Sequence, residues 1–140
     1  MEVVALRPKL ASFRATAFTG ENKAESVLGQ QWALQLTQTI EVGLGIPVTP
    51  GGMLQAVVKI SLVANGSNEA QPDEKAAFSA DYEAKFNYAN EVTEADISHL
   101  IVQEPYQYVL VAQAFPLAMT HFRRELQAMG FDARQLPLGV

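Results

Sequence analysis

Hydrophobic and polar residues alternate with a period of two through most of the first part of the chain. From Trp32 to Ile46 the even positions are mostly apolar and the odd positions mostly polar or small. After the Pro- and Gly-rich break at 47–52, a second alternating run begins at Leu54. The third run, 76–88, is the most regular, with Ala, Phe or Tyr at every even position. A period of two is typical of strands that bury one face, so these runs predict three β-strands.

The segment before these runs, residues 6–18, is rich in β-forming residues but alternates poorly. Pro8 lies near its start, and proline in a sheet is confined mainly to edge strands and irregular positions. We therefore expect a further strand that is irregular or lies at an edge. Because consecutive strands joined by short breaks pair most simply with their neighbours, the simplest arrangement is an antiparallel meander.

Beyond the third run the spacing of apolar residues becomes helical. Thr93 is followed closely by two acidic residues, a pattern typical of a helix N-terminus. It predicts a short helix that ends at about Glu104. A longer helix is predicted from Pro105 to Met129, with a second start at Pro116 as the alternative.

The segment Pro105–Phe122 contains no charged residue. A helix that lies on one face of a sheet needs a single apolar stripe, whereas here the apolar residues extend further around the helix. Two prolines and several polar residues distinguish the segment from a membrane span, which needs about 20 mostly apolar residues. We expect a second subunit to pack against the outer side of this helix. The alternative is a single apolar helix tucked under loops.

The overall composition is that of one globular domain, residues 1–140. The formal net charge is −5 and Lys and Arg form no run, so neither nucleic acid nor a membrane surface is an expected partner. The lack of cysteine excludes a disulfide and a thiol nucleophile and suits a reducing compartment. The N-terminus has no secretory signal pattern, and we expect a cytoplasmic protein.

Residues suited to catalysis are sparse. His99 and His121 are the two histidines, and no constellation of Asp or Glu accompanies them. The Gly43-Leu44-Gly45 segment lacks the Lys-Ser/Thr pair of a phosphate-binding loop. The sequence therefore predicts no enzyme, no cofactor and no metal site.

Five short segments follow one another in order along nearly the whole chain. They are Trp32, residues 54–64, residues 78–83, Phe115-Pro116 and residues 135–140. Their order and spacing resemble the SecB family of bacterial protein-export chaperones. The resemblance implies an α+β fold with a four-stranded antiparallel sheet followed by a short and a long helix, packed as a dimer of dimers. It also implies an ATP-independent holdase that binds unfolded polypeptides during protein export and translocation.

Individual positions carry over from this resemblance. Trp32 matches a tryptophan beside the client groove of the family. Fourth-strand positions that influence tetramer assembly match Ala80, Tyr82 and Ala84. Asp81 matches an acidic residue that presents the outer sheet face to the SecA motor.

Two departures from the family pattern bear on SecA. Leu10 and Arg14 stand where the family has acidic residues on the first strand, and the usual acidic extension is missing because the chain stops at Val140. Asp81 and Glu83 remain as a candidate SecA-facing surface. The alternative is that they belong to an ordinary solvated strand face.

A holdase needs a long apolar groove lined by aromatic and flexible side chains. The residues predicted to line this groove are Trp32, Phe86, Tyr88, Tyr106, Tyr108 and Met119. The residues predicted at the oligomer interface are Ala80, Tyr82, Ala84, Leu117 and Phe122. For each aromatic residue the alternative is a place in the core.

Three functions are compatible with the sequence. The first is a general export chaperone of the SecB type, and the second is a SecB-like chaperone dedicated to one client, such as an antitoxin. The third, from another class, is a small-ligand carrier or an enzyme that uses the groove as a pocket. Client breadth distinguishes the first two, and suppression of aggregation without a ligand distinguishes both from the third.

Overall fold

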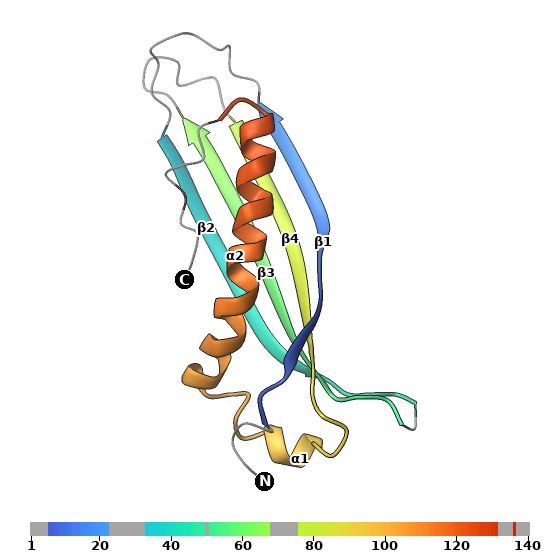
Figure 1. Ribbon diagram of the computed structural model, residues 1–140. Helices are drawn as coiled ribbons and strands as arrows, with labels where there is room; N and C mark the ends of the chain where they lie inside the picture. The colour runs from blue at the N-terminus through green and yellow to red at the C-terminus, as the bar shows by residue number, and fades with distance from the viewer. Residues whose placement is uncertain (1–5, 23–32, 50, 68–75, 132–135, 137–140) are drawn as a thin grey trace.

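A four-stranded sheet and one long helix form two layers (Figure 1). The computed structural model describes residues 6–22, 33–49, 51–67, 76–131 and 136. The elements in chain order are β1 (Lys9–Asn22), β2 (Ala33–Gly45), β3 (Gln55–Ser67), β4 (Ala76–Asn87), α1 (Glu94–Ile97) and α2 (Glu104–Ala128). The predicted antiparallel sheet followed by a short and a long helix is confirmed.

The strand order is β1-β4-β3-β2, with every neighbouring pair antiparallel. The predicted meander is therefore right for β2, β3 and β4 but wrong for β1, which pairs with β4. This pairing stacks Phe13 on Tyr82, with ring centroids 5.7 Å apart, and brings Phe18 against Phe122 of α2. Aromatic burial beside the helix thus favours the observed order. The edge position predicted for the first strand is confirmed.

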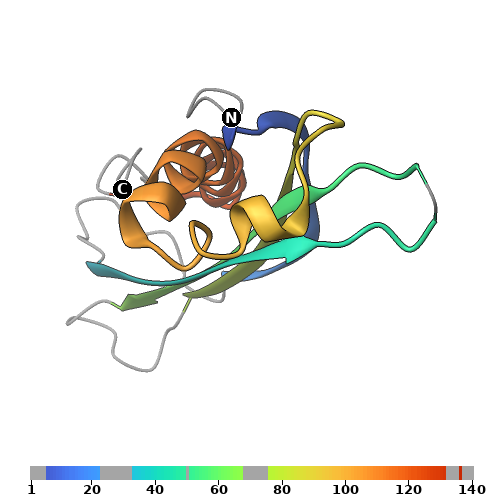
Figure 2. The same cartoon turned by 90° about the horizontal axis from the view of Figure 1, so that it is seen from below.

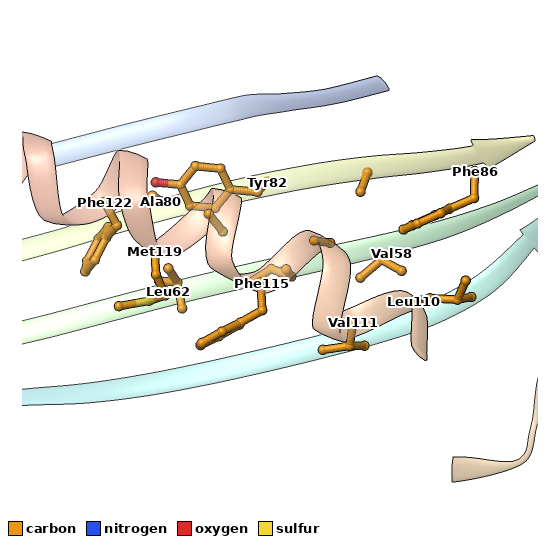
Figure 3. Packing of buried hydrophobic residues seen from close by; sticks show 14 of the residues in the cluster. Val58, Leu62, Ala80, Tyr82, Phe86, Leu110, Val111, Phe115, Met119 and Phe122 are labelled. Carbon is orange, nitrogen blue, oxygen red and sulfur yellow. The ribbon is translucent and has the colours of Figure 1, made fainter. Parts of the chain in front are cut away.

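The two central strands carry the buried face of the sheet. Every even-numbered residue of β4 is buried and every odd-numbered one is exposed or half-buried. In β3 the even positions from Ala56 to Gly66 are buried in the same way. The register pairs Ile60 with Tyr82 and Leu62 with Ala80, so the apolar rows lie side by side under α2 (Figure 3). The even positions of β3 and β4 are therefore apolar because α2 covers the face of the sheet on which they lie.

The long helix α2 continues through Pro116 without a second start. A proline inside a helix removes one backbone hydrogen bond and ordinarily costs about 3 kcal/mol. Here the turns on either side are held against the sheet by Phe115, Met119 and Phe122, which are fully buried (Figure 3). The hydroxyl of Thr120 also donates to the carbonyl oxygen of Pro116 at 2.7 Å. Burial of these side chains offsets the cost of the proline.

Gly130 ends α2 in the left-handed conformation, with φ of 90°. The backbone N–H of Phe131 donates to the carbonyl oxygen of Leu126, and that of Gly130 donates to Gln127. These two hydrogen bonds form a Schellman motif. The turn directs Phe131 back to the sheet, where its ring lies 5.3 Å from that of Phe78.

The short helix α1 ends at Ile97 and not near Glu104, so this part of the prediction is wrong. Its N-terminus is as predicted, since the backbone N–H and the hydroxyl of Thr93 both donate to the carboxylate of Asp96 at 3.0 Å. The backbone bond first, and the hydroxyl bond second, lower the pKa of Asp96. A single turn suffices to bury Ile97 fully, and the following turns bury Ile101 before α2 begins.

The β2–β3 hairpin extends beyond the body of the sheet, as Figures 1 and 2 show. Its apolar residues Ile46, Val48 and Met53 are 56%, 97% and 46% exposed. The view in Figure 2 also shows that α1 and α2 cover the same face of the sheet. The opposite face is left without a covering element among the described residues.

Replacement of Phe115 by Ala tests the packing of α2 on the sheet. The fully buried ring leaves a cavity when it is removed, so we expect the free energy of unfolding to fall by about 3–5 kcal/mol. Urea denaturation measures this loss. The control is Val102→Ala, because Val102 is 72% exposed and its loss should change stability by no more than about 0.5 kcal/mol. Equal losses in the two variants would contradict the packing described here.

Candidate functional site

Three apolar residues of α2 are exposed: Tyr108, Val109 and Leu117, at 57%, 38% and 41%. They lie at different angles around the helix axis, and we call them the exposed apolar residues of α2. The residues of α2 that face the sheet are Leu110, Val111, Ala114, Phe115, Ala118, Met119, Phe122 and Leu126. The sheet therefore buries most of the apolar surface of the charge-free segment, and the exposed apolar residues of α2 are what it leaves uncovered.

An apolar pocket lies where α2 begins. We call it the N-terminal pocket; its volume is about 410 Å³. It is lined by Leu6, Arg7, Pro8, Leu100, Gln103, Pro105, Tyr106, Val109, Leu110 and Gln113. Three segments form it, namely the residues before β1, the connection between α1 and α2, and the first turns of α2. Figure 1 shows these segments at one end of the molecule. Its size lies within the range of about 300–1,000 Å³ that is typical of ligand pockets.

A chain of two hydrogen bonds holds the wall of the N-terminal pocket. The hydroxyl of Tyr106 donates to the carbonyl oxygen of Leu6 at 2.7 Å, and the hydroxyls of Tyr88 and Tyr106 lie 2.5 Å apart. Because Tyr106 has one hydroxyl hydrogen, Tyr88 is the donor to Tyr106. These bonds connect three segments that are distant in sequence. Burial raises the pKa of Tyr106, and burial together with the donated hydrogen bond raises that of Tyr88.

The outer face of the sheet is polar and its charges are balanced. Glu83 lies 3.3 Å from Arg14 and 3.8 Å from Lys85. The register places Lys59 beside Glu83 on one side and Glu41 on the other, so charges of alternating sign cross the four strands. This arrangement stabilises the strand pairing. It leaves Glu83 flanked by cations.

A shallow hollow of about 420 Å³ lies on the same outer face. Within it the hydroxyl of Ser61 donates to the carboxylate of Asp81 at 2.7 Å, and that of Thr16 donates to the backbone carbonyl of Asp81. These neighbours are hydroxyl groups, which suit an exposed strand face that contacts water. Asp81 and Glu83 thus lie on the outer face, as the alternation predicts, and both have partners within the protein.

The histidine His121 has partners that the sequence interpretation missed. Its Nδ1 lies 2.8 Å from the hydroxyl of Tyr82, and its Nε2 lies 3.5 Å from Glu125. The spacing of four residues between His121 and Glu125 on a helix was a signal for the second contact. Burial, followed by the charge of Glu125, raises the pKa of Tyr82. The phenol therefore stays neutral, and the cluster attaches α2 to β4.

The structure separates the residues predicted to line the client groove. Tyr106 lines the N-terminal pocket, and Tyr108 is one of the exposed apolar residues of α2. Phe86, Tyr88 and Met119 are buried in the core of the protomer, with exposures of 0%, 2% and 0%. The prediction that these three line an accessible groove is therefore wrong for the single protomer. Their even strand positions or inward helix positions explain the burial.

Trp32, the first residue of the predicted groove, lies outside the described residues. Four of the residues predicted at the oligomer interface are buried beneath or within α2 of the same protomer: Ala80, Tyr82, Ala84 and Phe122. In the protomer they pack the helix on the sheet, so these four are core residues and their prediction as oligomer-interface residues is corrected. Leu117 is exposed and remains available to a second subunit.

Sequence interpretation missed most of the N-terminal pocket. Leu6, Pro8 and Leu100 lie in segments without a regular period, and their proximity depends on how β1 joins the sheet. Val109 lies in the charge-free segment and was not assigned to a site. The proline at position 8, placed before the first strand, was the available signal for a change of direction.

No group of three His, Asp or Glu residues in the described part of the chain is placed to hold a metal ion. Within the same ranges, none of the helices combines the length and the hydropathy that crossing a membrane requires.

Comparison with known proteins identifies the fold. No protein-family model and no curated protein matches the chain. Among solved structures, it is similar to the Mycobacterium tuberculosis SecB-like chaperone Rv1957, determined in complex with a ChAD peptide from the Rv1956 HigA1 antitoxin. The TM-score is 0.62 at 17% sequence identity, over 96% of this chain and 92% of that chain. The chain therefore has a SecB-like fold.

The raised pKa values of Tyr82 and Tyr88 predict how stability depends on pH. An unfolded phenol ionises near pH 10, whereas these two remain neutral in the folded protein, so the unfolded state loses protons first as the pH rises. The stabilisation is fully present below about pH 10 and is lost above it. Urea unfolding measured from neutral to alkaline pH should show this decline.

The double variant Tyr82→Phe/Tyr88→Phe should lose stability less steeply above that pH, because neither side chain can ionise. Tyr108→Phe is the matched control, since the side chain of Tyr108 is exposed in the folded protein. An identical alkaline slope in the wild type and the double variant would contradict the assignment.

Proposed function

We propose that the protein is an ATP-independent holdase that binds unfolded or non-native polypeptides. The observation that carries this proposal is the apolar N-terminal pocket, whose lining includes the exposed side chain of Val109. Such a surface binds exposed apolar side chains by burial, which contributes about 25 cal/mol per Å² and requires no particular sequence. The SecB-like fold supports the same function.

We further propose a client groove that extends beyond one protomer. Tyr106 and Tyr108 contribute to it in the described part of the chain, and Trp32 is proposed as an aromatic anchor because it matches a tryptophan beside the client groove of the SecB family. Several shallow contacts across a multimer add up in avidity when one client engages them together. A homotetramer, arranged as a dimer of dimers in the cytoplasm, provides such a surface.

A chaperone dedicated to one client, such as an antitoxin, is favoured over a general export chaperone. The outer face of the sheet, where the SecA motor would dock, has its acids paired, because Arg14 and Lys85 flank Glu83. A basic partner would have to displace these cations. The similar structure from Mycobacterium tuberculosis contains a peptide of an antitoxin, which supports the same choice. SecA is the partner of the alternative proposal.

Suppression of aggregation tests the holdase function. The wild type should slow the aggregation of a chemically unfolded client, followed by light scattering, without added nucleotide. The double variant Tyr108→Asp/Val109→Asp should bind the client about tenfold more weakly, since truncating or charging an interface anchor commonly costs about 1.4 kcal/mol or more.

The control for this experiment is Val63→Asp. Val63 is 39% exposed, like Val109, but lies on the outer face of the sheet, so its replacement should leave protection intact. Protection that appears only with added nucleotide would refute the holdase mechanism. Loss of protection in the control alone would show that the client binds to the outer face of the sheet.

The native mass tests the proposed tetramer. Leu117 lies exposed in the middle of α2, and we expect Leu117→Asp to split the particle because a carboxylate would be buried between helices. The wild type should have four times the 15.3 kDa mass of the chain in native mass spectrometry. The control is Val102→Asp, which makes the same kind of substitution in the α1–α2 connection and should leave the mass unchanged. A wild-type mass of one chain at micromolar concentration would reject the tetramer.

A further inference from the structure

The N-terminal pocket contains polar groups that an apolar cavity does not need. The side-chain nitrogen of Gln103 donates to the carbonyl of His99, and that of Gln113 donates to the carbonyl of Val109. Their side-chain oxygens accept no hydrogen bond from any described residue. Two amide oxygens at an apolar pocket are suited to accept hydrogen bonds from the backbone N–H groups of an extended chain.

Arg7 adds a positive charge to the rim of this pocket. It lines the N-terminal pocket and also a second hollow of about 520 Å³, which we call the basic hollow. The basic hollow is lined by Arg7, Lys9, Leu10, Ala11, Asn87, Tyr88, Ala89 and Glu91. Its charged residues are two cations and one acid, on a chain whose formal net charge is −5. Neither Arg7 nor Lys9 forms an ion pair with any residue that the structure describes.

We propose that the N-terminal pocket and the basic hollow together bind an extended polypeptide segment in which an apolar side chain is followed closely by a carboxylate. The apolar side chain enters the N-terminal pocket beside Leu110 and Val109, where its burial supplies affinity. The carboxylate lies against Arg7, whose planar guanidinium donates two parallel hydrogen bonds to such a group. The inference rests on the proposed function and gives that function a preference among clients.

The positive charge of the basic hollow favours a client as its occupant over a second copy of this chain. Among the described residues, the tip of the β2–β3 hairpin exposes the apolar residues Ile46, Val48 and Met53. This segment contains no acidic residue, so it offers no partner for Arg7 or Lys9. A client that carries an apolar residue beside an acid satisfies both parts of the surface. The same charges disfavour segments in which the apolar residue is flanked by Lys or Arg.

Two labelled peptides test the proposal with the full-length protein. Both are short and unstructured, and both contain a central Leu-Phe pair. They differ only at the position two residues after this pair, which is Glu in one peptide and Gln in the other. Fluorescence anisotropy should show that the wild type binds the Glu peptide about fivefold more tightly, as expected for an ion pair worth about 1 kcal/mol. Arg7→Gln should reduce this ratio to about one, with no change in affinity for the Gln peptide.

Two further variants separate charge from apolar burial. Val109→Ser should weaken the binding of both peptides equally, because it removes part of the apolar wall without touching Arg7. Arg14→Gln is the matched control, since Arg14 is an exposed arginine on the outer face of the sheet, and it should keep the wild-type ratio. Raising the salt concentration should reduce the ratio in the wild type and leave the binding of the Gln peptide unchanged.

Several results would overturn the inference. A ratio of one in the wild type, or an unchanged ratio in Arg7→Gln, removes the carboxylate preference. A change of native mass in Val109→Ser with unaltered peptide binding assigns the pocket to a second copy of the chain. Binding of decanoate with no binding of either peptide assigns it to a small ligand. If the wild type still suppresses aggregation in these cases, only this inference fails; if it does not, the proposed function fails as well.

Discussion

One packing constraint governs this protein: the apolar rows of β3 and β4 have to be covered along most of their length by one long helix. The 12 residues of β4 extend over about 40 Å at about 3.4 Å per residue. The 25 residues of α2 extend over about 37 Å at 1.5 Å per residue. The two lengths match, so a break at Pro116 would leave part of the sheet facing water. The continuity of α2 through a proline, the position of Gly130 beyond its end and the return of Phe131 to the sheet all follow from this requirement.

The candidate site consists of what this packing leaves uncovered. A helix that lies on a sheet buries one side, and the residues on its other side are free to vary within the limits of solubility. In this chain they are apolar in the first half of α2 and polar further on. The first turns of α2 also project where the residues before β1 and the α1–α2 connection converge, which turns an exposed helix face into a pocket. The opposite face of the sheet differs from this surface because it is polar and its charges are paired.

Most of the fold was predictable from the sequence, because a burial pattern with a fixed period identifies an element regardless of what covers it. The regular alternation of 76–88 predicted β4 closely, and Thr93 predicted the start of α1. The pairing of β1 was not predictable, since it depends on contacts such as that of Phe13 with Tyr82, between residues far apart in the chain. The same limit applies to the site. Aromatic residues such as Phe86 were predicted as groove lining because residue type alone does not separate a core position from an exposed one.

The hydrogen bond from Tyr106 to the carbonyl oxygen of Leu6 has a consequence for how this surface can diversify. The bond fixes the backbone of residue 6 and does not depend on the side chain at that position. The wall of the N-terminal pocket is therefore held in place by backbone atoms, while its side chains determine its chemistry. Side chains at positions 6 and 7 can change while the sheet, the helix and the anchoring tyrosines stay in place. Under the proposed function, substitutions in this one short segment next to β1 would change the size and charge of the polypeptide segment that the surface binds.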